Sequence, residues 1–322
     1  MLCKTDSDCP HSYCMNGDGK TPIADGCYMC HNNIPTKKIA DNVFMPMAGL
    51  GTWQYNDTTA YNAVSLAMKL GYTHIDCALG YGNQVSVGKA LKDSGRDRKS
   101  YFITSKIPGG LNTTFAKSQL DLSLQQLGLD SVDLMLVHYP AAWSGVGGKA
   151  LRIAEWKALE AFHKAGKAKA IGVSHYCRRH LEDIMEIATV PISVNQVQYH
   201  VGMGNAKDNA TDFKSFCDQH GIVYESFSPL CGPCGTKELL NGPLVTGIGK
   251  RYGKTGAQVS LKWQTQMGIP VIPKSDKMDH LLENIDLFDW TLSEEDMDTL
   301  TRATSPAVAG DGHGNSGDCS VL

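Results

Sequence analysis

The feature that most restricts the fold of this chain is an alternation between short apolar runs and longer stretches of helical periodicity, from about residue 34 to residue 305. The runs have strand length, and the stretches between them carry apolar stripes. This pattern is typical of repeated βα units, which form parallel sheets. We predict strands at residues 48–51, 73–76, 101–106, 132–138, 168–174, 192–196, 222–227 and 269–272, and helices at 58–70, 115–127, 153–164, 211–220 and 257–266.

Eight strands with intervening helices predict an α/β fold of the (β/α)₈, or TIM, barrel type, which commonly spans roughly 250 residues as one domain. A doubly wound Rossmann sheet is the competing architecture. It requires G-x-G-x-x-G after its first strand, and residues 49–53 (GLGTW) break that pattern. Residues 247–255 resemble a phosphate-binding loop with the wrong glycine spacing, and we expect a helix boundary there.

Both ends differ from the barrel in composition. Residues 1–33 contain Cys3, Cys9, Cys14, Cys27 and Cys30 and no periodic apolar pattern, so we expect a short cysteine-rich extension stapled by disulfides. A zinc site at Cys27, Cys30 and His31 is the rival interpretation, and free thiols are the third. Residues 34–305 are the predicted barrel, and residues 306–322, rich in Gly, Ser and Asp, are expected to form a mobile tail.

Charge and hydropathy narrow the class of partner. The net charge is −3, with no basic cluster of the kind that binds nucleic acid or a membrane surface. No apolar run approaches the ~20 residues of a membrane helix. We therefore expect small-molecule chemistry, without a nucleic-acid partner, a membrane partner or a resident metal, on a monomer.

Four ionisable side chains fall where a barrel places its active site, at the carboxyl ends of the strands. Asp76, Lys106 and His138 each end an otherwise apolar run, and Tyr81 follows Asp76 closely. A charge at the end of a buried strand is costly unless it is paired, so we expect Asp76 and Lys106 to neutralise each other. A purely structural ion pair is the alternative.

Nine short motifs, in one order along residues 36–300, resemble those of the aldo-keto reductases. They are residues 45–53 (MPMAGLGTW), 74–76 (HID), 81–83 (YGN), 104–106 (TSK), 137–140 (VHYP), 170–174 (AIGVS), 195–200 (NQVQYH), 227–230 (FSPL) and 272–275 (IPKS). The resemblance implies an enzyme that transfers hydride from NADPH to an aldehyde or ketone.

In that reaction the resemblance implies a catalytic tetrad. Tyr81 donates a proton to the oxygen that gains charge, and a neighbouring Lys106 ammonium lowers the pKa of the phenol. Asp76 keeps Lys106 charged and oriented, and His138 aims the carbonyl at Tyr81. A regulatory or sensor subunit that binds NADPH with little turnover is the alternative function, and the complete tetrad favours the enzyme.

The resemblance also implies a set of cofactor contacts along the carboxyl ends of the strands. They are Gly51, Thr52, Ser174, His175, Gln196, Phe227, Ser228, Leu230, Lys274, Ser275, His280, Glu283 and Asn284. Phe227 is expected to stack on the nicotinamide, and Lys274 to hold the 2′-phosphate that distinguishes NADPH from the less favoured NADH.

Four positions depart from the family's pattern. Phe227 replaces Tyr, His175 replaces Asn, His280 replaces an Arg, and Gln84 replaces the Glu that follows Tyr-x-Asn. The His280 change removes a permanent charge near the expected 2′-phosphate, and the Gln84 change alters the support of the Tyr81 loop.

Three aromatic residues, Trp53, Tyr139 and Trp143, are expected to line an apolar substrate pocket, although simple loop packing is the alternative. Cys231 and Cys234 form C-x-x-C after the seventh predicted strand. A redox switch there competes with a plain loop, which the flanking Gly and Pro favour. A reductase that uses a nicotinamide cofactor is expected in the cytoplasm, whereas disulfides in residues 1–33 would place the protein in the secretory pathway.

Overall fold

The computed structural model describes residues 34–204 and 213–306, with only the backbone of Phe213. The predicted cysteine-rich extension, nearly all of the predicted tail and the first residues of the predicted helix 211–220 lie outside the described residues.

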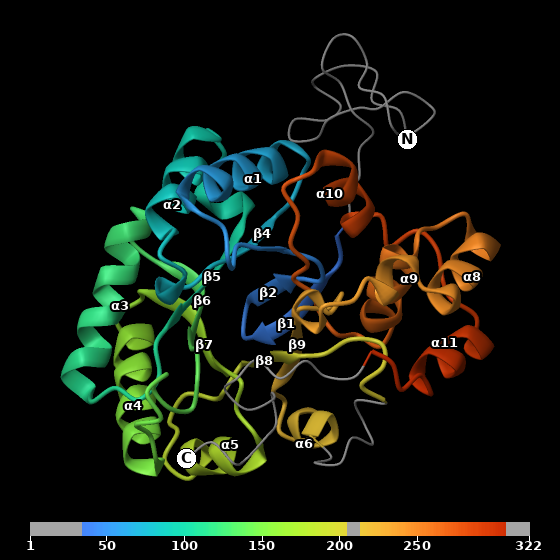
Figure 1. Ribbon diagram of the computed structural model, residues 1–322. Helices are drawn as coiled ribbons and strands as arrows, with labels where there is room; N and C mark the ends of the chain where they lie inside the picture. Colours follow the sequence, from blue (N-terminus) through green and yellow to red (C-terminus); the bar gives the residue numbers. More distant parts are fainter. Residues whose placement is uncertain (1–33, 205–212, 307–322) are drawn as a thin grey trace.

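Seven parallel strands form a sheet in chain order and curl into a barrel (Figure 1). They are β3 (Leu50–Gly51), β4 (His74–Asp76), β5 (Phe102–Ile107), β6 (Val132–Val137), β7 (Ala168–Ser174), β8 (Val194–Gln198) and β9 (Val223–Phe227). The predicted eighth strand closes the barrel through single bridges, from Val271 to Ser226 on one side and to Ala48 on the other. The (β/α)₈ prediction is thus confirmed.

Helices cover the outside of the barrel (Figure 1). Those that follow the strands are α1 (Asp57–Lys69), α2 (Gln84–Asp93), α3 (Thr113–Leu127), α4 (Lys149–Lys164), α5 (Arg178–Met185), α6 (Phe213–Gln219), α9 (Gly256–Gln266) and α10 (Met278–Ile285). Local capping defines where they begin: Asn56 Oδ1 accepts from Thr59 N at α1, and Asn112 Oδ1 accepts from Phe115 N at α3.

Shorter helices lie in the loops and at the end of the described chain. They are η1 (Leu79–Tyr81), η2 (Arg98–Ser100), η3 (Gly232–Cys234), α7 (Glu238–Asn241), α8 (Pro243–Tyr252) and α11 (Glu294–Thr301). The expected helix boundary within residues 247–255 is confirmed: α8 ends at Tyr252, Gly253 caps it with a φ of +64°, and Thr255 caps α9.

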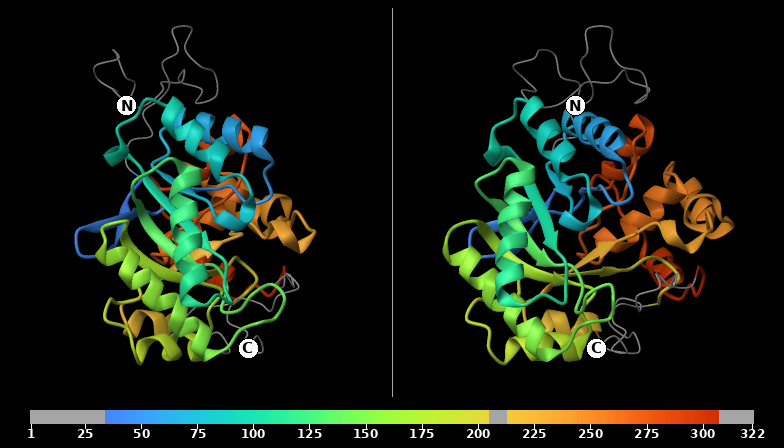
Figure 2. Two further views of the ribbon diagram at one scale, coloured as in Figure 1. Left: turned by 90° about the vertical axis from the view of Figure 1, so that its left-hand side faces the viewer. Right: turned by 60° about the vertical axis from the view of Figure 1, so that its left-hand side comes forward.

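An antiparallel hairpin that sequence reasoning missed precedes the barrel, made of β1 (Thr36–Ala40) and β2 (Val43–Pro46). Ile39, Val43 and Met45 pack against side chains of the barrel interior, including Leu134 and Val194. The hairpin lies at one end of the barrel (Figure 2). It covers the amino-terminal ends of the strands, so among the described residues the carboxyl-terminal end is the one open to a ligand.

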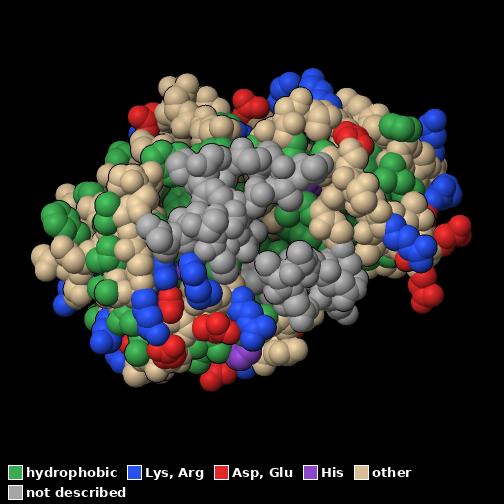
Figure 3. Space-filling model, turned by 60° about the horizontal axis from the view of Figure 1, so that its bottom comes forward, with side chains coloured by type: hydrophobic (Ala, Val, Ile, Leu, Met, Phe, Trp, Pro, Cys, Tyr) green, Lys and Arg blue, Asp and Glu red, His purple; other side chains and the backbone are tan. Residues whose placement is uncertain are grey.

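Acidic and basic side chains are interspersed on the face in Figure 3, without a large region of one sign. Within residues 34–204 and 213–306, none of the helices has both the length and the apolar character needed to cross a bilayer.

Candidate active site

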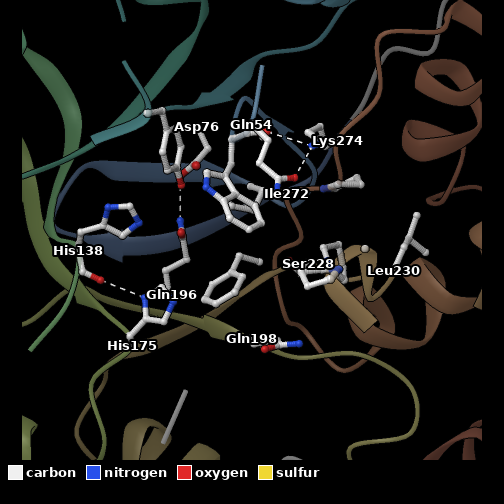
Figure 4. A pocket seen from close by; sticks show the side chains of 18 of the residues that line it. Gln54, Asp76, His138, His175, Gln196, Gln198, Ser228, Leu230, Ile272 and Lys274 are labelled. Atoms are coloured by element: carbon white, nitrogen blue, oxygen red, sulfur yellow. Dashed lines mark hydrogen bonds between the residues drawn. The ribbon is translucent and has the colours of Figure 1, made fainter. Parts of the chain in front are cut away.

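A cavity of about 350 Å³ opens at the carboxyl ends of the strands. Most of the residues predicted for the site line it. From the predicted set these are Gly51, Trp53, Asp76, Tyr81, His138, Tyr139, Trp143, His175, Gln196, Phe227, Ser228, Leu230 and Lys274. Figure 4 shows His138 and His175 on one side of the cavity, with Ser228, Leu230 and Lys274 on the other. The volume falls within the ~300–1,000 Å³ usual for ligand sites.

At the base of the cavity a buried ion pair contacts a phenol. Lys106 Nζ donates to Asp76 Oδ1 at 2.5 Å and lies 3.2 Å from the hydroxyl of Tyr81. Lys106 is fully buried, and its third interaction is with the carbonyl of Cys77 at 3.2 Å. Burial acts to lower the pKa of Lys106, but Asp76 and Tyr81 more than offset it, and the net pKa is raised. Lys106 therefore stays an ammonium beside Tyr81.

The acidity of Tyr81 differs from the sequence-based expectation. Burial raises the pKa of its phenol to about 12, although Lys106 acts in the expected lowering direction. The expectation of a net lowered pKa is wrong, because loss of hydration outweighs one ammonium that Asp76 already neutralises in part. Tyr81 is consequently protonated at neutral pH and available as a proton donor.

A row of neighbouring rings forms one wall. The ring of His175 lies between those of Tyr139 and Phe227, with centroid distances of 4.2 Å and 4.6 Å. Its Nδ1 donates to the backbone carbonyl of His138 at 3.0 Å. His175 has φ of +62°, a region that His and Asn tolerate better than most residues, which explains how His replaces Asn here.

His138 lies within the same wall. Its ring meets that of Tyr81 edge to face at 5.4 Å. Burial, with Lys106 and His175 adding to it, lowers the pKa of His138 well below its ordinary value, so the imidazole is neutral. A neutral ring beside Tyr81 can form a hydrogen bond to a carbonyl oxygen without adding charge.

Gln196 links the Asp76–Lys106 ion pair to Glu225, a carboxyl group that sequence reasoning missed. Its Nε2 donates to Asp76 Oδ2 and to Glu225 Oε2, each at 2.9 Å. Glu225 is fully buried in β9, and burial, then Asp76, raise its pKa to about 8. A glutamate inside the apolar run 222–227 was the available signal, because an unpaired charge is rarely buried.

Lys274 bridges the rim of the cavity. Its Nζ donates to the carbonyl of Trp53 at 3.0 Å and to Gln54 Oε1 at 3.1 Å (Figure 4). Gln54 was not predicted, and Gln198, Ile272 and Pro273 also line the cavity without having been predicted. Gln54 and Pro273 come from irregular segments and Gln198 ends β8, and residue type alone did not single them out.

Several expected contacts lie outside this cavity. Thr52 is buried, and its hydroxyl donates to the carbonyl of Asp76 at 3.0 Å, which supports the end of β4. Ser174 is also buried, and its hydroxyl donates to the carbonyl of Gln196 at 2.8 Å. Four more, all near α10, do not line the cavity either: Ser275, His280, Glu283 and Asn284.

The substitution at Gln84 leaves the Tyr81 loop well supported. Gln84 is fully buried, and its Oε1 accepts from Ser105 Oγ at 2.5 Å and from Ser123 Oγ at 3.2 Å. Asn83 adds a bond from Nδ2 to the carbonyl of Thr52 at 2.9 Å. Gln84, whose change from Glu was expected to alter the support of the Tyr81 loop, therefore still anchors the start of α2 through side-chain hydrogen bonds.

Comparison with known proteins agrees with the geometry. The sequence profile of the Aldo/keto reductase family matches residues 47–304. A glyoxal reductase of Bacillus subtilis (strain 168) is 38% identical over 269 residues, covering 82% of this chain and 91% of that protein. An Arabidopsis thaliana protein, aldo-keto reductase family 4 member C11, is 38% identical over 274 residues, covering 80% and 85%.

Solved structures show the same likeness. An aldo-keto reductase enzyme from a Medee basin deep-sea metagenome library superposes with a TM-score of 0.76 at 36% identity, covering 83% of this chain and 95% of that one. The aldose reductase from Schistosoma japonicum gives 0.72 at 28% identity, covering 82% and 90%.

Proposed function

The chain belongs to the aldo/keto reductase family of oxidoreductases, and on that premise we propose that it transfers hydride from NADPH to an aldehyde or ketone, with Tyr81 as the acid. The observation that carries the proposal is the contact of Lys106 with both Asp76 and Tyr81 at the base of an aromatic cavity.

The donor set of the cavity suits a nicotinamide cofactor. Phe227 offers an aromatic face for the ring, and Gln196, whose Nε2 is engaged by two carboxyl groups, keeps its Oε1 for a carboxamide. Ser228 and Leu230 supply the opposite wall, and Lys274 supplies a cation at the rim. When bound, the cofactor supplies the hydride.

The protein's own residues supply the proton and hold the carbonyl. As the carbonyl oxygen gains negative charge, the phenol of Tyr81 donates its proton, and Lys106 stabilises the phenolate that remains. His138 donates a hydrogen bond that orients the oxygen. Because an alkoxide is a far stronger base than a phenolate, this transfer is favourable even with the Tyr81 pKa at about 12.

Trp53, Tyr139 and Trp143 give the entrance an apolar character, and Trp53 and Trp143 are 42% and 66% exposed. This favours carbonyl compounds with a hydrophobic body. Because one relative is named as a glyoxal reductase, a panel of carbonyl compounds for testing should also include small dicarbonyl compounds.

A Tyr81→Phe variant tests the proposal in an assay of NADPH oxidation against this carbonyl panel. We expect NADPH binding, measured by fluorescence titration, to be retained, with turnover lowered about 10²- to 10⁴-fold by loss of the acid. Tyr139→Phe removes a hydroxyl from the same cavity without touching the Lys106 contact, and should retain most of the turnover. Equal turnover in Tyr81→Phe and the wild type would contradict the assignment.

The choice of cofactor is tested at Lys274. Replacing it with Met should weaken NADPH binding by about 1.5–3 kcal/mol, roughly ten- to a hundredfold, because a charge-assisted bond to the 2′-phosphate is lost. NADH lacks that phosphate, so its dissociation constant should barely change. An equal loss for both cofactors would show that Lys274 does not select the phosphate.

A further inference from the structure

A disulfide bond joins Cys231 and Cys234 in the wall that follows β9. Their Cα atoms are 5.3 Å apart, within the range that disulfides require. The turn favoured by the sequence is present as η3, and the bond closes it. Leu230 and Pro233 line the cavity directly. Any change in this bond therefore acts on the wall of the candidate active site.

A histidine from the segment after the neighbouring strand lies beside this disulfide. His200 lies just after β8, and its Nδ1 is 2.8 Å from the carbonyl oxygen of Val201. A carbonyl only accepts, so Nδ1 carries the hydrogen and Nε2 of the neutral ring has a free electron pair. Nε2 lies 3.8 Å from Cys234 Sγ. Burial lowers the pKa of His200, which keeps the ring neutral and able to take a thiol proton.

We propose that Cys231 and Cys234 form a thiol–disulfide exchange site, with His200 as its base and a dithiol as its redox partner. Cys234 is partly exposed and Cys231 is fully buried, so an incoming thiolate reaches Cys234. Cys77 and Cys217 offer a contrast among the described cysteines: burial raises the pKa of each thiol to about 12, which makes both unreactive.

The exchange balances as a two-electron reaction. A thiolate of the partner attacks Cys234 Sγ, the bond to Cys231 breaks, and Cys231 leaves as a thiolate. In the mixed disulfide, one sulfur of the partner is bonded to Cys234 Sγ. The second thiolate of the partner attacks this partner sulfur, and Cys234 is released as a thiolate. The partner is oxidised to a disulfide, and its two protons pass to the two cysteines. His200 delivers one of them to Cys234 and takes it back when the bond re-forms.

Reduction releases a turn with an uncommon backbone. Ser228 and Cys231 have φ of +47° and +51°, which residues other than glycine rarely adopt. The disulfide and a hydrogen bond from Cys231 N to Ser228 O, 2.8 Å long, hold this turn. The next step rests on the proposed function: Ser228 and Leu230 are among the expected cofactor contacts, so loosening the turn weakens NADPH binding.

The exchange site is tested first without any cofactor. Differential alkylation with peptide mass mapping measures Cys231 and Cys234 separately from the other cysteines of the full chain. In dithiothreitol buffers we expect the pair to open and close reversibly, and His200→Gln to slow this about tenfold or more.

Three results would overturn the exchange site. The first is failure of the pair to form the bond in oxidising buffer, and the second is an unchanged rate in His200→Gln. The third is a reduced chain that retains one Zn²⁺ through both cysteines and His200 and resists oxidation, because the same three side chains lie close enough to hold a metal ion.

The coupling to the cavity is tested by NADPH titration of the oxidised and reduced chain. We expect the dissociation constant to rise about fivefold or more on reduction. By thermodynamic linkage, NADPH must also shift the midpoint potential of the Cys231–Cys234 disulfide, by about 30 mV for each tenfold difference in NADPH affinity between the oxidised and reduced chains. This shift can be measured on the wild-type protein.

The Cys231→Ala/Cys234→Ala double variant is the matched control, and its NADPH affinity should not respond to dithiothreitol. Equal affinities in the two wild-type states would overturn the coupling. Reversible exchange in a chain that binds no NADPH in either state would instead contradict the proposed function.

Discussion

Asp76 shows how one residue at this site serves two networks. Its Oδ1 accepts from Lys106 and its Oδ2 from Gln196, which also contacts Glu225. Two carboxyl groups thus lie near one buried ammonium, which can balance only one negative charge. Burial and the nearby Asp76 therefore raise the pKa of Glu225 to about 8. At neutral pH Glu225 holds a proton that the unfolded chain does not.

Glu225→Gln should change how stability depends on pH. Because the folded pKa lies above the unfolded one, the wild type loses stability as pH rises from about 4.5 to about 8, and the neutral amide removes that loss. Near pH 9 we expect the melting temperature of the variant to exceed that of the wild type by a few degrees, which corresponds to about 1 kcal/mol or more in the free energy of unfolding. Near pH 5 the difference should be smaller.

The control is Glu295→Gln on the exposed surface of α11, whose melting curve should follow the wild type at both pH values. Parallel pH curves for Glu225→Gln and the wild type would show that Glu225 is ionised throughout.

At the scale of the element, the β1–β2 hairpin decides which end of the barrel is open. Met45 is fully buried and Phe44, its neighbour, is 54% exposed, so alternate residues of β2 face the barrel and the solvent. The hairpin carries none of the residues that line the cavity. Its contribution is stability and closure.

Met45→Ala should lower the free energy of unfolding by about 2–4 kcal/mol, because it leaves a cavity beneath the barrel. Phe44→Ala, at an exposed position of the same strand, should cost much less. Chemical denaturation measures both. The KM and kcat of Met45→Ala should match the wild type at temperatures where it stays folded, and a selective loss of kcat would place the hairpin in the site instead.

At the scale of the whole molecule, the core and the cavity lining that the structure describes come from residues spread along 34–204 and 213–306. The strands meet at one end, which brings together residues as distant as Gly51 and Lys274.

Because the predicted barrel begins after residue 33, deleting residues 1–33 should leave kcat and KM for carbonyl reduction unchanged. Steady-state assays of the truncated and full chains measure this. If the extension instead carries a partner-binding role, the truncated chain loses a partner and keeps its turnover. A large loss of kcat in a truncated chain with an unchanged melting temperature would contradict a self-contained barrel.

The sequence alone determined the fold class and the identity of the tetrad candidates. The alternation of apolar runs with helical stretches is local, and Asp76, Lys106 and His138 are recognisable because each ends or directly follows such a run. The hairpin was missed, because two strands of four or five residues without a glycine turn give a weak local signal.

Only the tertiary structure decided the electrostatics. The rise of the Tyr81 pKa, the contact between Gln196 and Glu225, and the place of His200 beside Cys234 all depend on burial and on residues from different strands. Desolvation and through-space contacts are properties of the packed barrel, whereas periodicity and strand ends are already present along the chain.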